Sequence, residues 1–344
     1  MKVPVIYTED IRSTLLALKA KMEPDRVFVL CDSHTERLFL PLLRMPEARV
    51  ISVECGDGNK TLATLSQVWQ ALQEGGATRH SLLINLGGGM VTDLGGFAAA
   101  TFKRGMRFIN VPTTLLAMVD AAVGGKTGIN FGGLKNEVGC FREADEVVIH
   151  TPFLRTLDTP NLRAGYAEML KHALLTGRKM WAAHLHFDLS APDLGALQEM
   201  VRQSIEVKQR IVLEDPCEKG LRKALNLGHT VGHALESMAM KRAPLLHGYA
   251  VAYGLIAELY LSTTLTGFPT EALYQTAHFI REYYGRPDIG CNDYDALYAL
   301  MQHDKKNCGD DIHFTLLADV GKPLINQKTT HELINEALDF LRDA

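Results

Sequence analysis

The N-terminal half of the chain alternates short apolar runs with segments of helical periodicity. The apolar runs cover residues 26–31, 49–54, 81–86 and 107–111. Because apolar positions do not alternate with polar ones, these runs predict parallel strands that are covered on both faces. Residues 60–74 carry leucines and a tryptophan at helical spacing and stop at Gly75 and Gly76, which is typical of a helix with a glycine terminator. We therefore expect an open α/β domain.

A second pattern begins near residue 159, where helical periods follow one another with little strand signal. They cover residues 160–176, 194–213, 221–239, 248–266, 269–284 and 330–343, and the one clear strand is residues 312–317. Thr159 is expected to cap the first of these helices, with Pro160 as its first helical residue. These boundaries predict an α/β domain over residues 1–158 and a mostly α-helical domain over residues 159–344.

Composition narrows the partners that the chain can bind. Its 344 residues are enough for two domains, and 47% hydrophobic against 22% charged residues is typical of a globular protein. A net charge of −4 without any basic tract argues against a nucleic-acid partner. The sequence has neither a membrane-length apolar run nor a signal-peptide pattern, so we expect a cytoplasmic protein without a membrane partner. The six cysteines are scattered, without a CxxC pair, and we assign them no role.

Two glycine-rich segments are candidates for phosphate binding. Residues 87–89, all glycine, follow the third apolar run and precede a helical stretch, an arrangement that suits a pyrophosphate. Thr92 replaces the third glycine of the GxGxxG pattern, so a tight structural turn is the alternative. The second segment, residues 119–128, lacks the first glycine of a Walker loop, which disfavours a P-loop NTPase. Cations near it suit a phosphate-bearing substrate, with solvated surface lysines as the alternative; they are Lys103, Arg104, Lys126 and Lys135.

A candidate metal site lies in the second half of the chain. Glu168 and Lys171 share a helix face, and His229 and His233 are four residues apart on another helix. Together with His247, this set of imidazoles and a carboxylate suits zinc or a similar ion with open positions for a substrate. Spacing alone nominates His229 and His233 as the chelating pair. Five other histidines are expected to be structural, namely His150, His184, His186, His303 and His313.

Taken together, these motifs resemble those of the 3-dehydroquinate synthase family, a group of sugar-phosphate cyclases. The most specific segments are Pro112–Leu116, Val119–Asp120, Gly124–Thr127 and Asn226–His233. Further matches, in the family's order and approximate spacing, extend over residues 87–141, 164–171, 226–236, 246–248 and 304–306. The resemblance implies a Rossmann-like α/β N-terminal domain that binds NAD. It also implies a mostly α-helical C-terminal domain that binds a divalent metal, zinc or cobalt.

The resemblance assigns site residues one position at a time. The metal would be held by Glu168, His229 and His247, so that His233 becomes a catalytic residue instead of a ligand. The other catalytic positions are Asp120, Lys171 and Glu218. The NAD positions are Asp57, Lys60, Gly88, Gly89, Asp93, Thr113, Thr114, Lys135 and Thr156. The substrate positions are Lys126, Asn136, Lys208, Arg222, Asn226, Lys305 or its neighbour Lys306, and Arg104, which reaches the partner's site in a homodimer.

The implied reaction converts 3-deoxy-D-arabino-heptulosonate 7-phosphate to 3-dehydroquinate and phosphate, in the shikimate route to aromatic amino acids. NAD takes a hydride and returns it within one cycle, phosphate is eliminated, and an intramolecular aldol step closes the ring. A site dense in Lys126, Lys171, Lys208 and Arg222 suits a substrate that has both a carboxylate and a phosphate. Asp57 is one methylene shorter than the glutamate usual in the family, which bears on the strength of NAD binding. The alternatives are a related cyclase that makes an inosose or a valiolone, a metal-dependent polyol dehydrogenase, and a non-catalytic NAD-binding scaffold.

Overall fold

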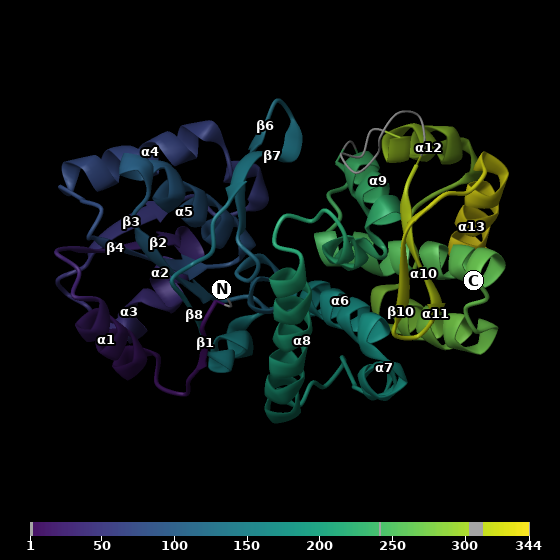
Figure 1. Ribbon diagram of the computed structural model, residues 1–344, viewed down its shortest axis with the longest axis horizontal. Coiled ribbons are helices and arrows are strands. Elements are labelled where there is room, and N and C mark those ends of the chain that lie inside the picture. Colours follow the sequence, from purple (N-terminus) through teal and green to yellow (C-terminus); the bar gives the residue numbers. More distant parts are fainter. Residues whose placement is uncertain (1–2, 241, 303–311, 344) are drawn as a thin grey trace. The chain divides into compact units, whose positions relative to one another are not determined.

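The computed structural model describes residues 3–240, 242–302 and 312–343 (Figure 1). The chain divides into two compact units, one that ends at Leu157 and one that begins at Asp158. Among the described residues, no helix is long and apolar enough to cross a membrane.

A six-stranded parallel sheet forms the centre of the N-terminal unit. Its strand order is β1-β8-β5-β4-β2-β3, and each neighbouring pair runs parallel. Every residue of β2 and β4 is buried, as their unbroken apolar runs predict. The strands are β1 (Val5–Tyr7), β2 (Val27–Asp32), β3 (Arg49–Val53), β4 (Leu82–Gly87), β5 (Arg107–Pro112) and β8 (Glu146–Ile149).

Helices cover both faces of this sheet (Figure 1). On one face α3 contacts α1 and α2, and on the other α4 contacts α5. Parallel strands are joined by right-handed crossovers, so the direction in which the chain moves across the sheet decides which face a connecting helix covers. The chain moves toward β3 in its first two connections, and from β3 onward it moves in the opposite direction. The helices of the first two connections therefore lie on one face, and the later ones lie on the other. The helices are α1 (Ile11–Met22), α2 (Ser33–Leu38), α3 (Leu40–Leu43), α4 (Leu62–Glu74) and α5 (Gly89–Thr101), and the short turns are η1 (Asp57–Asn59), η2 (Phe102–Arg104), η3 (Ala117–Ala121) and η4 (Thr151–Thr156).

The direction in which the chain crosses the sheet reverses between β2 and β4. The chain leaves β2 toward β3 and returns to β4 on the opposite side of β2, so the loops that follow these two strands diverge. Gly87 ends β4, and Gly89 begins α5 directly beyond it. Open α/β sheets bind their ligands at such a reversal.

Helices dominate the C-terminal unit. α10 contacts α6, α9, α11, α13 and the strand β9 (Phe314–Asp319), so it lies at the centre of this unit. The helices are α6 (Thr159–Thr176), α7 (Arg178–Leu185), α8 (Leu194–Glu214), α9 (His229–Ala239), α10 (His247–Thr266), α11 (Thr270–Tyr284), α12 (Tyr294–Gln302) and α13 (His331–Asp343), with the turns η5 (Leu221–Asn226) and η6 (Cys291–Asp293).

Two local predictions for this unit are wrong. The helix expected over residues 221–239 is split, because Gly228 adopts a φ of 79° and separates η5 from α9. The cap of α6 is Asp158, whose side chain accepts a hydrogen bond from Asn161 N at 2.8 Å, and Thr159 is instead the first helical residue. Pro160 stays in the first turn, where its missing N–H leaves no helical bond unmade.

The sequence pattern also misses two antiparallel hairpins. β6 (Lys126–Phe131) pairs with β7 (Leu134–Phe141), and β9 (Phe314–Asp319) pairs with β10 (Lys322–Gln327). Only the strand that becomes β9 was expected. Most positions of β7 and every second position of β10 are exposed, so polar residues and glycines interrupt the apolar signal there.

α9 and α10 touch backbone to backbone. A Cβ on Gly254 would lie 1.9 Å from the carbonyl oxygen of Gly228, and a Cβ on Gly232 would lie 2.9 Å from that of Ala250. Any larger side chain would push the helices apart, so these glycines allow the close approach. The pairing of position 228 with 254 and of 232 with 250 shows that the two helices are antiparallel.

Candidate active site

Three glycines without side chains, Gly87–Gly89, join the end of β4 to the first turn of α5 and are called the glycine seat here. Gly88 is the N-cap residue of α5, and no side chain in the described part of the chain caps this helix. A Cβ on Gly88 would lie 3.2 Å from Thr114 Cγ2, and one on Gly89 would lie 3.3 Å from Ala121 Cβ. Because the first amides of a helix have no helical partner and the dipole is positive there, this seat fits the pyrophosphate of a dinucleotide.

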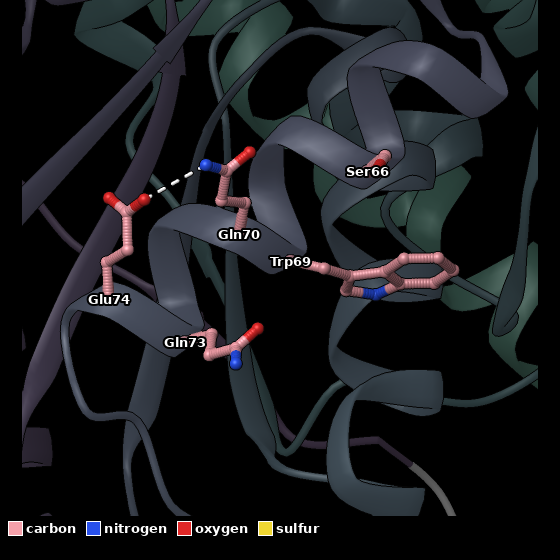
Figure 2. Close-up of a pocket in the computed structure, with 5 residues that line it drawn as sticks. All are labelled: Ser66, Trp69, Gln70, Gln73 and Glu74. Atoms are coloured by element: carbon pink, nitrogen blue, oxygen red, sulfur yellow. Dashed lines mark hydrogen bonds between the residues drawn. The ribbon is translucent and has the colours of Figure 1, made fainter.

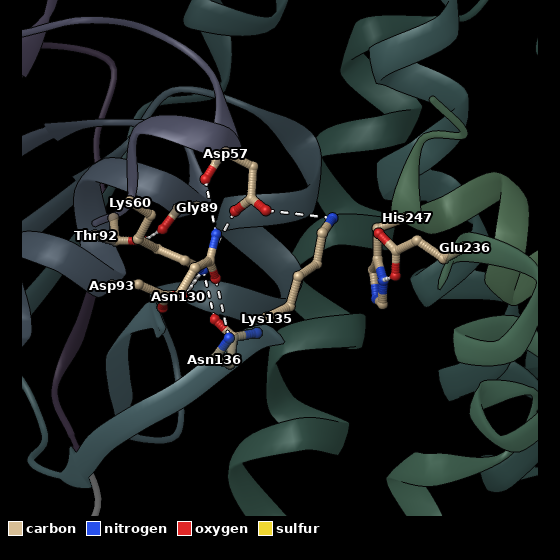
Figure 3. A network of polar contacts seen from close by, with 10 residues as sticks. All are labelled: Asp57, Lys60, Gly89, Thr92, Asp93, Asn130, Lys135, Asn136, Glu236 and His247. Carbon is tan, nitrogen blue, oxygen red and sulfur yellow. Dashed lines mark hydrogen bonds and ion pairs between the residues drawn. The ribbon is translucent and has the colours of Figure 1, made fainter. Parts of the chain in front are cut away.

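A buried lysine organises the side chains of this unit around Asp93, which lies in α5 (Figure 3). Lys60 is 3% exposed, and its Nζ lies 3.0 Å from Asp93 Oδ2 and 2.6 Å from Asn136 Oδ1. Asp57 joins both lysines of the network, with Oδ1 3.3 Å from Lys60 Nζ and Oδ2 3.2 Å from Lys135 Nζ. The structure thus brings together five residues that the sequence analysis assigns to NAD or substrate.

Pairing of opposite charges keeps most of this network ionised despite its burial. Burial alone would lower the pKa of Lys60, but Asp93 and Asp57 more than offset it and raise that pKa above its usual value. Burial opposes the ionisation of Asp57 too, yet Lys60 and Lys135 hold its pKa below the usual value. Burial dominates for Asp93, whose pKa is raised in spite of Lys60. Asp57 is therefore a carboxylate and a hydrogen-bond acceptor at neutral pH.

Two threonines connect the glycine seat to the neighbouring strand β5. Thr113 N donates to Gly87 O at 3.0 Å, and Thr114 Oγ1 accepts a hydrogen bond from Ala117 N at 3.2 Å. Both therefore lie beside the end of β4, where the sequence analysis expects them. The other predicted residues of this unit are Arg104 in η2, Asp120 in η3, Lys126 in β6 and Thr156 in η4.

Three side chains of the C-terminal unit converge on one point. Glu168 comes from α6, His229 is the first residue of α9, and His247 is the first residue of α10. Glu168 Oε1 lies 3.4 Å from His229 Nε2 and 3.5 Å from His247 Nε2, and the ligand atoms all lie within 4.8 Å of one another. Glu168 is fully buried, and neither of its carboxylate oxygens accepts a well-aligned hydrogen bond from the described residues. This donor set fits a divalent metal.

The second nitrogen of each imidazole is held by another group. His229 Nδ1 lies 3.1 Å from the carbonyl oxygen of Leu227, and His247 Nδ1 lies 3.2 Å from Glu236 Oε2 (Figure 3). Because a carbonyl or carboxylate oxygen can only accept, each Nδ1 carries a proton, so Nε2 is the nitrogen of each ring that can bind a metal. Metal-ligating histidines are oriented in this way.

The charges around this cluster favour a bound cation. Burial opposes the ionisation of Glu168, but Lys171, its ion-pair partner, and His229 hold the pKa of Glu168 well below its usual value. Burial and the charge of Lys171 lower the pKa of His229 to about 3, so this ring is neutral at pH 7. Burial acts in the same direction on His247, yet Glu168 and Glu236 raise its pKa to about 10. The two carboxylates therefore stabilise positive charge beside His247.

Buried cations from three packed elements occur in the same unit. Lys171 of α6, Lys208 of α8 and Arg222 of η5 are 1%, 6% and 2% exposed. Asn226 Nδ2 donates to Glu218 Oε1 at 3.0 Å, which brings two more predicted residues together. Three buried cations in packed elements create a positive potential, so this region suits an anionic ligand.

The last predicted residues of this unit are His233 and Lys305. The His233 ring lies 5.3 Å from that of His229 and 5.9 Å from that of His247, measured between ring centroids. His233 thus lies beside the cluster. Lys305 and Lys306 lie outside the described residues.

The sequence analysis missed two buried carboxylates. Glu236 of α9 contacts His247, and Glu258 of α10 accepts hydrogen bonds from the start of α9. A signal existed for Glu258, because it is the one Asp, Glu, Lys or Arg among the 20 residues of α10. Glu236 is likewise the one such residue in α9, but this helix is shorter, and helix surfaces commonly hold single charges, so its signal is weaker.

A depression of about 790 Å³ lies along α4 and is lined by Ser66, Trp69, Gln70, Gln73 and Glu74 (Figure 2). Gln70 Nε2 donates to Glu74 Oε1 at 3.0 Å, and Trp69 Nε1 donates to Ala98 O at 3.3 Å. These groups serve contacts within α4 and between α4 and α5. We assign no chemistry to this depression.

Solved structures share the fold of this chain. That of 2-deoxy-scyllo-inosose synthase with carbaglucose-6-phosphate, NAD+ and Co2+ is 22% identical, with a TM-score of 0.86 and 98% of each chain covered. That of 2-epi-5-epi-valiolone synthase from Streptomyces hygroscopicus with NAD+ and Zn2+ is 24% identical, with a TM-score of 0.83 over 99% of this chain and 97% of that one. The predicted fold, that of the dehydroquinate synthase-like enzymes, is confirmed.

Sequence comparison identifies the family within this class. Residues 50–164 match the family described as 3-dehydroquinate synthase N-terminal, and residues 165–307 match 3-dehydroquinate synthase C-terminal. A 3-dehydroquinate synthase from Parabacteroides distasonis is 52% identical over 99% of this chain and 98% of its own length. The chain therefore belongs to the 3-dehydroquinate synthase family. It is an enzyme that converts 3-deoxy-D-arabino-heptulosonate 7-phosphate to 3-dehydroquinate and phosphate, and an inosose or valiolone synthase is not favoured.

Proposed function

We propose that the enzyme performs this reaction with NAD in its N-terminal domain, residues 1–158, and a divalent metal, zinc or cobalt, in its C-terminal domain, residues 159–344. The observation that carries the proposal is the convergence of Glu168 Oε1 with two imidazole Nε2 atoms, whose rings are oriented by their second nitrogens. The NAD+ with Co2+ or Zn2+ in the two structural relatives supports the same pair of cofactors.

In the N-terminal domain, the glycine seat at Gly88 and Gly89 would receive the pyrophosphate of NAD. Asp57 follows β3 and is ionised, so it would accept hydrogen bonds from a ribose hydroxyl. Lys60 and Lys135 fix both oxygens of Asp57 and so prepare it for that contact. The remaining NAD positions are Asp93, Thr113, Thr114 and Thr156. NAD supplies a reversible hydride acceptor.

In the C-terminal domain, Glu168, His229 and His247 would hold the metal, which polarises substrate oxygens when bound. Lys171, the ion-pair partner of Glu168, balances its charge and would also contact the substrate. His233 and Glu218 would move protons, assisted by Asp120. Substrate anions would be bound by Lys126, Asn136, Lys208, Arg222, Asn226 and Lys305.

Arg222 is proposed to bind the carboxylate of the substrate. Relatives that form an inosose do not need to recognise a carboxylate. Arg222→Ala should raise the KM for the heptulosonate phosphate roughly 10- to 100-fold, because hydrogen bonds between charged groups contribute about 1.5–3 kcal/mol. Steady-state kinetics at saturating NAD and Zn2+ would measure this change. Lys223→Ala is the matched control, because this neighbouring cation contacts Asn326 at 3.2 Å and should leave KM within about twofold. An unchanged KM in folded Arg222→Ala would contradict the carboxylate role.

We further propose that the enzyme is a cytoplasmic homodimer and that Arg104 reaches the partner's site. The support is an apolar pair near the tip of the β6–β7 hairpin, where Phe131 and Leu134 lie directly opposite each other and are 53% and 59% exposed. Large apolar side chains that are exposed together are typical of an interface.

Replacing Phe131 and Leu134 together with Asp should convert the dimer to a monomer, because two charges would be buried in the interface. Sedimentation velocity at micromolar concentration measures the change. Leu324→Asp, on the exposed β10, is the control and should remain dimeric. An F131D/L134D protein that sediments as a dimer would show that the hairpin is not the interface.

A further inference from the structure

Glu258 is a buried carboxylate that serves a helix other than its own. It lies in the middle of α10 and is 0% exposed. Its Oε2 accepts a hydrogen bond from Gly228 N at 2.6 Å, and its Oε1 accepts from Thr230 N at 2.9 Å and from Val231 N at 3.2 Å. Glu258 therefore occupies the place of a capping residue at the start of α9.

The local sequence explains why the cap comes from a neighbouring helix. The N-cap residue of α9 is Gly228, which has no side chain to offer and adopts a φ of 79°. A Cβ at this position would lie 2.9 Å from Leu255 Cδ2, so the contact with α10 leaves no room for Ser, Asp or Asn there. Gly254 allows the two backbones to meet, and Glu258 follows one turn later on the same helix face.

One peptide unit connects Glu258 to a proposed metal ligand. The peptide between Leu227 and Gly228 donates its N–H to Glu258 Oε2, and its carbonyl oxygen accepts the hydrogen bond from His229 Nδ1. The orientation of this peptide plane thus fixes the tautomer and direction of the His229 ring. A carboxylate paired directly with a ligating imidazole performs this task in many metal sites. Here the peptide lies between them.

We propose that Glu258 is a positioning residue of the metal site, which holds the start of α9 and, through the Leu227–Gly228 peptide, orients His229 toward Glu168. Its negative charge also neutralises the positive end of the α9 dipole, directly beside the residue that must present a lone pair to a cation. The inference rests on the proposed metal set of Glu168, His229 and His247.

The test compares Zn2+ affinity in two variants of the full-length, metal-free protein. Glu258→Gln keeps the shape of the side chain but replaces one acceptor oxygen with an NH2 group, so it cannot accept all three N–H bonds. Its dissociation constant for Zn2+, measured by competition with a chromogenic chelator, should rise about 10- to 100-fold. Ser262→Ala is the matched control, because Ser262 Oγ donates to Glu258 O and accepts from Leu317 N without touching α9. It should lower the melting temperature and leave Zn2+ affinity within twofold.

Folding of each variant is checked by circular dichroism. Zn2+ binding by folded Glu258→Gln within twofold of the unmodified enzyme, alongside loss of binding in His229→Ala, would overturn the role of Glu258 and keep the metal site. Unchanged binding in His229→Ala would overturn the metal site and this inference together. If Glu258→Gln does not fold, Glu258→Asp replaces it. This variant keeps the charge but shortens the reach, so binding at least fivefold weaker supports the role and unchanged binding overturns it.

Discussion

Replacing Glu168 with Gln is expected to lower kcat/KM about 1,000-fold or more and to release most of the bound zinc. A metal that polarises substrate oxygens supplies several kcal/mol of transition-state stabilisation, and each 1.36 kcal/mol is tenfold in rate. The amide removes the one anionic ligand of the set, with nearly no change in shape. Kinetics at saturating Zn2+ and the zinc content after desalting would measure both effects.

Glu168→Gln also leaves Lys171 buried beside a neutral group, so part of the loss of activity would come from a less stable fold. His247→Ala separates the two causes, because its side chain is 28% exposed and it is not the ion-pair partner of Lys171. We expect this variant to lose activity to a similar degree with a smaller drop in melting temperature. Glu199→Gln, at a 62% exposed side chain of α8, should change neither property. Full zinc content and activity in Glu168→Gln would remove Glu168 from the site.

Replacing Lys60 with Met is expected to lower the free energy of unfolding by about 3 kcal/mol and to weaken NAD binding at least about tenfold. Methionine keeps the apolar stem of the side chain but leaves Asp93 and one oxygen of Asp57 without their cation. Asp57 would lose the orientation that suits it to a ribose. Chemical denaturation and NAD titration by calorimetry would measure the two effects.

The deficit in unfolding free energy should also depend on pH. Burial already raises the pKa of Asp93, and loss of Lys60 would raise it further above the unfolded value. The folded state then holds a proton that the unfolded state releases, so the deficit should grow as pH rises from about 4 to 7. Lys19→Met is the control, because the Lys19–Glu47 ion pair is exposed and its loss should change stability by less than about 1 kcal/mol. Equal losses of unfolding free energy in Lys60→Met and Lys19→Met would show that the buried ion pairs of Lys60 stabilise the fold no more than an exposed ion pair does.

Four of the six central strands were predictable, because β2 and β4 are buried throughout and β3 and β5 also carry short apolar runs, whereas the short edge strand β1 and its neighbour β8 were not predicted. The β6–β7 hairpin was not, because glycines and exposed polar residues hide its pattern. The split between η5 and α9 depends on the left-handed conformation of Gly228, which close packing on α10 requires and no local pattern reveals.

The spacing of histidines in the sequence indicated where a metal site lies, but it did not identify which residues form it. His229 and His233 are four residues apart on one helix, yet the atoms that approach Glu168 belong to His229 and His247, from two helices. That grouping depends on the antiparallel contact of α9 with α10, a long-range feature which the family resemblance supplied and spacing did not. Glu258 was missed for the same reason, since its partners lie 27 to 30 positions away in the chain.

The most direct test of this account follows two products of one reaction. The purified enzyme is incubated with NAD, Zn2+ and 3-deoxy-D-arabino-heptulosonate 7-phosphate, while phosphate release and NADH absorbance are recorded together. We expect phosphate to be released over many turnovers without net NADH, because the hydride taken by NAD is returned within each cycle. Accumulation of NADH in step with substrate consumption, or no phosphate release from enzyme shown to hold both cofactors, would contradict the account.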